Sequence, residues 1–157
     1  NNNNNDNNNN NDNVIEIYAH KILLSRIPYF TSLFSGQYND GVIDENGCTV
    51  HDINGFVADG IDSETFQELL RYAYSGSLSV IDGEHVSSNS LMSLIVASNR
   101  VGLYQLAQLC EKRLSLHLGD FPENLENCYE FAQTFNIPRL TRQCQELLAQ
   151  KNRTTTY

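Results

Sequence analysis

The stretch AHKILLSRIPYFTSLFSG, residues 19–36, contains two short apolar segments separated by a proline. Pro28 interrupts the helical pattern before it, because proline lacks a backbone N–H and disfavours helical geometry at the preceding residue. Proline also suits the first turn of a helix, so a second helix is predicted from Pro28 to about Phe34. The stretch therefore predicts two short helices that meet at an angle, which we call the corner.

Each helix of the corner is predicted to present an apolar face. The apolar residues are Ile22, Leu23, Leu24 and Ile27 in the first helix, and Tyr29, Phe30, Leu33 and Phe34 in the second. His20 stands at the entrance of the first helix. We interpret it as a structural histidine satisfied by the backbone, in preference to a catalytic or switching group.

The rest of the chain is dominated by apolar residues at helical spacing. Asp62 or Ser63 is predicted to cap a helix that Gly76 ends, and Gly102 separates two further helices that we expect to form an antiparallel hairpin. Another helix pair is predicted beyond Gly119. The apolar stripes are Phe66, Leu69, Leu70 and Ala73; Leu91, Leu94, Ile95 and Ser98; Leu103, Leu106, Ala107, Cys110 and Leu114; Leu125, Cys128, Tyr129 and Ala132; and Leu140, Cys144, Leu147 and Leu148.

The β-structure predicted from the sequence is small. The turn dipeptide Asn54-Gly55 favours a hairpin between two short strands, while residues 82–89 are predicted to be loop. The predicted strands are residues 14–18, 49–53, 56–58 and 78–81. The fold class is therefore α+β, with a small β-sheet flanked by a cluster of helices and followed by an extra helix pair.

Composition narrows the class of protein. The net charge of −9 comes from 10 basic and 19 acidic residues without a Lys/Arg block, which argues against a nucleic-acid partner. No segment approaches the roughly 20 apolar residues that a membrane-spanning helix needs. Residues 1–13 contain 11 Asn and are predicted to be a disordered low-complexity tract. Because the chain begins with Asn and its only methionine is Met92, we expect it to be a piece of a longer polypeptide.

The cysteines and acidic residues do not form a recognisable catalytic or metal-binding motif. Cys48 and His51 form a C-x-x-H pair without a second half, so we do not expect a zinc site. Cys110, Cys128 and Cys144 occupy apolar positions of helical stripes and are predicted to be core residues of an intracellular, reducing compartment, the cytoplasm or nucleus. An acidic cluster lacks the ligand order of a calcium loop. We therefore expect neither an enzyme nor a cofactor. The clustered acidic residues are Asp40, Asp44, Glu45, Asp52 and Asp59.

Four blocks of sequence together resemble BTB/POZ domains followed by the start of a BACK-type extension. Besides the corner, they are SETFQELLRYAYSGSLSV, SLMSLIVASNRVGLYQLAQLCEKRL and NLENCYEFAQTFNIPRLTRQCQELL. In the family's usual form a Ser precedes the proline of the corner, where this chain has Ile27. The resemblance implies a BTB/POZ domain over residues 14–118, the start of the extension over 119–150, and a tail over 151–157.

The resemblance implies a protein-interaction module. BTB domains homodimerise, and many bind the N-terminal domain of cullin-3 and thereby recruit substrates to a ubiquitin ligase. Cullin-binding members carry a hydrophobic-x-Glu motif after the aromatic helix; here Tyr38 fills the hydrophobic position and Asp40 replaces Glu. Family dimers also pack the corner into the core and against a second subunit. The candidate corner residues are His20, Leu24, Tyr29, Phe30 and Phe34.

Two other classes stay open at this point. One is a BTB homo-oligomerisation or scaffold module without cullin binding, and the other is a linker of related fold, of the elongin type. The chain also departs from the family pattern. The family's first strand either lies upstream of the Asn tract or is absent. The segment between Asp40 and Phe56 is longer than usual, and residues 81–86 look like an insertion before the helical hairpin.

Overall fold

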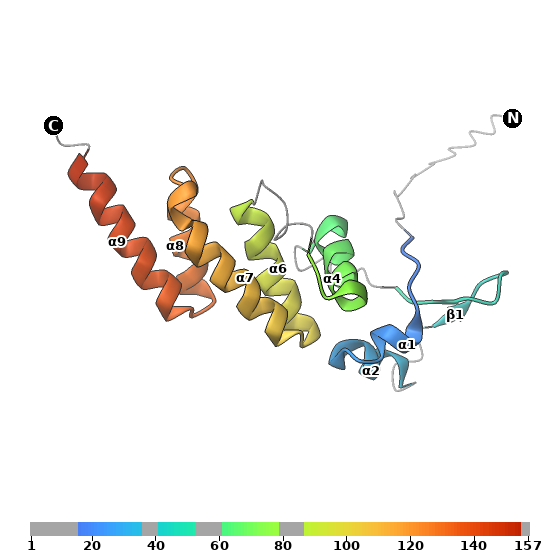
Figure 1. Ribbon diagram of the computed structural model, residues 1–157. Coiled ribbons are helices and arrows are strands. Elements are labelled where there is room, and N and C mark those ends of the chain that lie inside the picture. The colour runs from blue at the N-terminus through green and yellow to red at the C-terminus, as the bar shows by residue number, and fades with distance from the viewer. Residues whose placement is uncertain (1–15, 36–40, 53–60, 79–86, 155–157) are drawn as a thin grey trace, which may run out of the picture.

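The computed structural model describes residues 16–35, 41–52, 61–78 and 87–154, and over these ranges the protein is mostly helical with one small antiparallel sheet. The helices follow one another from the corner to the C-terminal helix, and the β-hairpin projects at the opposite end from that helix (Figure 1). The fold is α+β, as predicted. The elements are α1 (Lys21–Leu24), α2 (Pro28–Phe34), β1 (Val42–Ile43), β2 (Thr49–Val50), α4 (Ser63–Ser75), α6 (Ser88–Val101), α7 (Tyr104–His117), the 3-10 helix η1 (Leu118–Asp120), α8 (Leu125–Thr134) and α9 (Pro138–Thr154).

The structure confirms the corner. Helix α1 ends before the proline, Ile27 adopts an extended backbone, and Pro28 is the first residue of α2. Phe30 is buried and its ring lies 6.2 Å from the ring of Phe66 on α4. Ile22, however, is 78% exposed, because α1 is a single helical turn and packs only one of its sides against the core.

The described residues contain a β-hairpin that the sequence did not predict, formed by β1 and β2. Val42 pairs with Val50 across the two strands, and Gly47 closes the turn with a φ of 78°. The Asp44 carboxylate accepts hydrogen bonds from the backbone N–H groups of Asn46 (2.9 Å) and Cys48 (2.7 Å). This Asp-anchored turn forms the hairpin, whereas the predicted turn at residues 54–55 lies outside the described residues.

Two other local predictions were wrong. Residues 16–18 belong to no strand, because no other segment of the described chain pairs with them. Ser88 and Asn89, predicted to be loop, instead form the start of α6, with Ser87 as its N-cap. Of the strand predicted at residues 78–81, Leu78 is outside any strand, and the rest lies outside the described residues.

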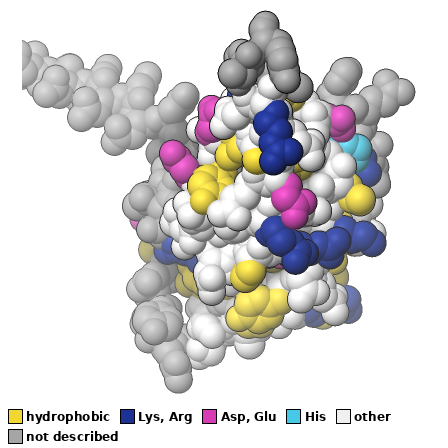
Figure 2. Space-filling view, turned by 90° about the vertical axis from the view of Figure 1, so that its left-hand side faces the viewer, with side chains coloured by type: hydrophobic (Ala, Val, Ile, Leu, Met, Phe, Trp, Pro, Cys, Tyr) yellow, Lys and Arg dark blue, Asp and Glu magenta, His cyan; other side chains and the backbone are white. Residues whose placement is uncertain are grey.

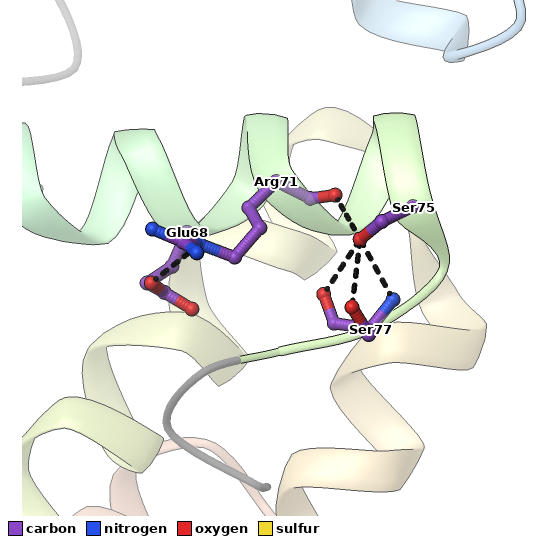
Figure 3. Close-up of polar contacts among 4 residues, drawn as sticks. All are labelled: Glu68, Arg71, Ser75 and Ser77. Carbon is purple, nitrogen blue, oxygen red and sulfur yellow. Dashed lines mark hydrogen bonds and ion pairs between the residues drawn. The ribbon is translucent and has the colours of Figure 1, made fainter. Parts of the chain in front are cut away.

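Helix α4 has defined ends. The Asp62 carboxylate accepts a hydrogen bond of 2.7 Å from the Thr65 N–H, and Gly76 ends the helix with a φ of 71°. At that end the Ser75 hydroxyl donates to the carbonyl of Arg71 (2.8 Å) and accepts from the Ser77 N–H (3.1 Å), as Figure 3 shows. These side-chain and glycine caps fix the direction in which the chain leaves α4.

Replacing Asp62 with alanine is expected to lower the free energy of unfolding by about 1 kcal/mol, because one N–H of the first turn of α4 loses its acceptor. Urea denaturation measures the loss. Ser87→Ala is the matched control, since the N-cap bond from Ser90 to the Ser87 hydroxyl is long at 3.5 Å. An equal loss in both variants would contradict a specific role for the Asp62 cap.

The core lies between α6, α7 and the elements packed on them. Helices α6 and α7 form the predicted helical hairpin around Gly102, which has a φ of 85°. A Cβ atom at Gly102 would lie only 3.0 Å from Cγ of Pro28, so the end of α6 is in close contact with the corner. Helices α8 and α9 form the second pair, also as predicted, and Asn136 between them adopts a φ of 51°. The fully buried side chains of the helices include Leu91, Leu94, Ile95, Leu106, Cys110, Leu114, Cys128, Leu140 and Cys144.

Candidate protein-interaction site

His20 is held by a tyrosine, not by the backbone as we expected. The Tyr74 hydroxyl accepts a hydrogen bond from the His20 backbone N–H, and it lies 2.9 Å from Nδ1 of the same residue. Because Tyr74 stands near the end of α4, this pair ties the entrance of α1 to a helix more than fifty residues further along the chain. The sequence contained Tyr74 within its YAYSG block but gave no sign of this contact.

The remaining candidate corner residues divide into two groups. Leu24 and Phe30 are buried in the core, so their side chains are not available to a partner. Tyr29 and Phe34 are half-buried at the edge of the core. The Phe34 ring lies beneath the ammonium of Lys21, 5.1 Å from its centre, and this cation–π contact adds to the packing of the corner.

The candidate cullin-binding residues Tyr38 and Asp40 lie outside the described residues. Their role therefore stays a prediction from the sequence.

An apolar groove runs between α6 and α8. It has a volume of about 310 Å³, and it opens between the residues just before α4, the middle of α6 and the exposed side of α8. Phe131 on α8 and Phe135 at its C-cap have ring centres 4.6 Å apart with the rings tilted by 37°, and Phe135 is 46% exposed. We call this the α6–α8 groove; its lining residues are Ile61, Met92, Ser93, Val96, Asn127, Phe131 and Phe135.

The chemistry of the groove suits an apolar ligand group. Two aromatic rings supply a large contact area, and Met92 has a flexible thioether side chain that adapts to irregular shapes. Ser93 and Asn127 add hydrogen-bonding groups at its edge. The apolar stripes did not reveal this groove, although the i, i+4 spacing of Phe131 and Phe135 beside the buried stripe of α8 was a signal for it.

Three cysteines are buried in the helical core, as predicted from their spacing. Burial raises the pKa of the Cys110 thiol to about 12 and that of Cys144 to about 11, and it also raises the pKa of Cys128. Cys48 is exposed. Within the described ranges, no group of three or more His, Cys, Asp or Glu residues is placed to hold a metal ion.

None of the helices in the described ranges has the length and apolar character that crossing a membrane requires.

A family match and three related proteins all point to the same domain family. Residues 11–118 match the BTB/POZ domain family. The chain is 28% identical over 130 residues to Armadillo BTB Arabidopsis protein 1 of Arabidopsis thaliana. It is also 28% identical over 132 residues to human Kelch repeat and BTB domain-containing protein 6, and 28% identical over 131 residues to human Kelch repeat and BTB domain-containing protein 7. Each alignment covers 82% of this chain but only 15% or 16% of the relative, so the chain spans about a sixth of the length of these proteins.

Proposed function

Because this chain belongs to the BTB/POZ domain family, whose members are protein-interaction modules, we propose that it recruits substrates to a ubiquitin ligase by binding cullin-3. The α6–α8 groove is the observation that supports this function best. One wall of the groove belongs to the matched residues 11–118, whereas the other is α8, which lies beyond them. In cullin-binding relatives of this family, helices that follow the domain line a cleft for the N-terminal extension of the cullin.

The proposed cullin interface has two parts. The groove takes an apolar side chain of the cullin extension, which would bury the exposed face of Phe135. Tyr38 and Asp40 form the second contact, with the tyrosine ring as an aromatic anchor and the carboxylate in the position that Glu occupies in the family motif. The assignment of α8 and α9 to a BACK-type extension is part of the same proposal.

Phe131→Ala is expected to weaken binding of the cullin-3 N-terminal domain by about 2 kcal/mol, because it removes an aromatic anchor from the groove. Isothermal titration calorimetry with a cullin fragment that keeps its N-terminal extension measures the change. Tyr38→Ala is expected to reduce affinity by a similar amount.

Tyr104→Ala is the matched control for these variants. Tyr104 is 64% exposed at the start of α7 and does not line the groove, so its loss should leave cullin affinity unchanged. Circular dichroism spectra confirm that each variant is folded. If the unmodified chain shows no detectable binding, the cullin function is wrong.

A scaffold module without cullin binding is the second candidate. The exposed side chains of Tyr18 (77%) and Ile22 (78%) beside the corner favour self-association through that end. Self-association in analytical ultracentrifugation, together with absence of cullin binding in the titration, would favour this function over the first.

A further inference from the structure

A second cleft lies between α7 and the start of α9. Its volume is about 290 Å³, and we call it the α7–α9 cleft. Figure 2, which views the α9 end of the molecule, shows Lys and Arg side chains on that end together with Asp, Glu and hydrophobic ones. The lining residues of the cleft are Gln108, Glu111, Lys112, Ser115, Ile137, Arg139 and Leu140.

Two cations line this cleft, and neither has a partner within the part of the chain that the structure describes. Lys112 and Arg139 form no ion pair or hydrogen bond through their side chains with any other described residue, whereas Lys151 lies 3.5 Å from Glu126. Glu111 also lines the cleft, so its lining carries two positive charges and one negative charge. One carboxylate from a partner would bring the net charge of this lining from +1 to zero, whereas a polyanion would leave it negative. Ile137 and buried Leu140 provide an apolar floor.

The opposite end of the molecule carries the complementary chemistry. The β-hairpin projects from the body there (Figure 1), and its strand residues Val42 and Ile43 are 69% and 71% exposed. Glu45 is exposed in the turn and its side chain makes no ion pair or hydrogen bond with the rest of the described chain. An isolated two-stranded hairpin is marginally stable, so this element would gain from a partner that covers its apolar side chains.

Charge is also unevenly distributed along the chain. Residues 1–100 contain 13 acidic and 4 basic side chains, whereas residues 101–157 contain 6 of each. The whole net charge of −9 therefore belongs to the first part, which includes the hairpin. A contact between the hairpin and the α7–α9 cleft brings acidic and cationic surfaces together and is electrostatically favourable.

We propose that the β-hairpin of one copy docks into the α7–α9 cleft of a second copy. The Glu45 carboxylate lies between Lys112 and Arg139, and Ile43, two residues before it, packs against Ile137. The contact is head-to-tail, because the two surfaces are different and lie at opposite ends of the chain. Such a contact propagates from copy to copy and produces rings or chains of molecules. The inference does not rest on the proposed cullin function.

Two charge-reversal variants test this contact by sedimentation velocity. The unmodified 157-residue chain is expected to increase in mean mass as its concentration rises from about 10 μM to about 1 mM, the range of a weak interface. Glu45→Lys keeps the cleft but loses the acidic turn, and Lys112→Glu keeps the turn but loses a cation of the cleft. Each variant alone is expected to associate about tenfold more weakly.

Mixing the two variants is the decisive measurement. In an equimolar mixture, the intact turn of Lys112→Glu meets the intact cleft of Glu45→Lys, so association is expected to return. Glu130→Lys and Arg26→Glu are the matched controls, because they reverse exposed charges outside both surfaces and should associate like the unmodified chain.

Three results would overturn the inference. One is a constant mean mass of the unmodified chain across the concentration range. Another is a mixture that associates no better than its separate components. The third is that Glu45→Lys alone associates as strongly as the unmodified chain while Lys112→Glu associates more weakly. That result would mean that the cleft binds a different segment of the second copy.

Discussion

Replacing Gly102 with alanine is expected to lower the free energy of unfolding by about 3 kcal/mol, the sum of two effects. The φ of 85° at this position is unfavourable for any residue with a Cβ atom. In addition, the new methyl group would lie 3.0 Å from Cγ and 3.2 Å from Cβ of Pro28. Because the proline ring is rigid and begins α2, the contact is relieved only by moving the corner away from α6.

Gly76→Ala separates these two effects. Gly76 has a similar φ of 71°, but a Cβ atom there would meet nothing within 4 Å, so only the backbone effect of about 1 kcal/mol remains. Urea denaturation of both variants measures the difference. Equal losses would show that Pro28 does not press on the end of α6.

Raising the pH from 9 to 11 is expected to destabilise the protein by about 4 kcal/mol through Cys110 and Cys144. The pKa of an ordinary thiol is 9.0, and burial raises the pKa to about 12 for Cys110 and about 11 for Cys144. Below pH 9 both thiols stay protonated in the folded and unfolded chain, so their contribution to stability is fully present. Above pH 9 the unfolded chain loses protons that the folded chain still holds, and stability falls until pH reaches the folded pKa values.

Single cysteine variants isolate this effect from other groups that titrate in the same range. The free energy of unfolding is measured by urea denaturation at pH 9 and pH 11. Cys110→Ala should remove about half of the thiol-dependent decrease, whereas Cys48→Ala should leave it unchanged because Cys48 is exposed. If the decrease is the same in all variants, the buried thiols are not its source.

The features that were predictable from the sequence are those determined by neighbouring residues. Pro28 fixes the break in the corner by its own covalent geometry, and Asp62 caps α4 through a bond to a residue three positions away. The hairpin around Asn46-Gly47 was not predicted, because the chain contains two Asn-Gly dipeptides and our prediction rested on the one at residues 54–55. Asp44, which accepts two backbone hydrogen bonds in the observed turn, was the local signal for the earlier one.

The candidate site was less predictable because distant segments build it. The α6–α8 groove combines Met92 with Phe131, and helical spacing reveals which side of each helix is buried but not what remains open at its edge. The contact between His20 and Tyr74 joins residues 54 positions apart. Tyr38 and Asp40 remain predictions from family resemblance.

The packing of the corner on later helices has a consequence during synthesis on the ribosome. Phe30 and Pro28 leave the exit tunnel before Phe66 and Gly102, the residues that they contact in the folded chain. At about 5–20 residues per second, the separation of 74 positions between Pro28 and Gly102 corresponds to a delay of roughly 4–15 s. During that interval the aromatic side chains of the corner lack the later helices that bury them in the folded chain, so they are exposed to water.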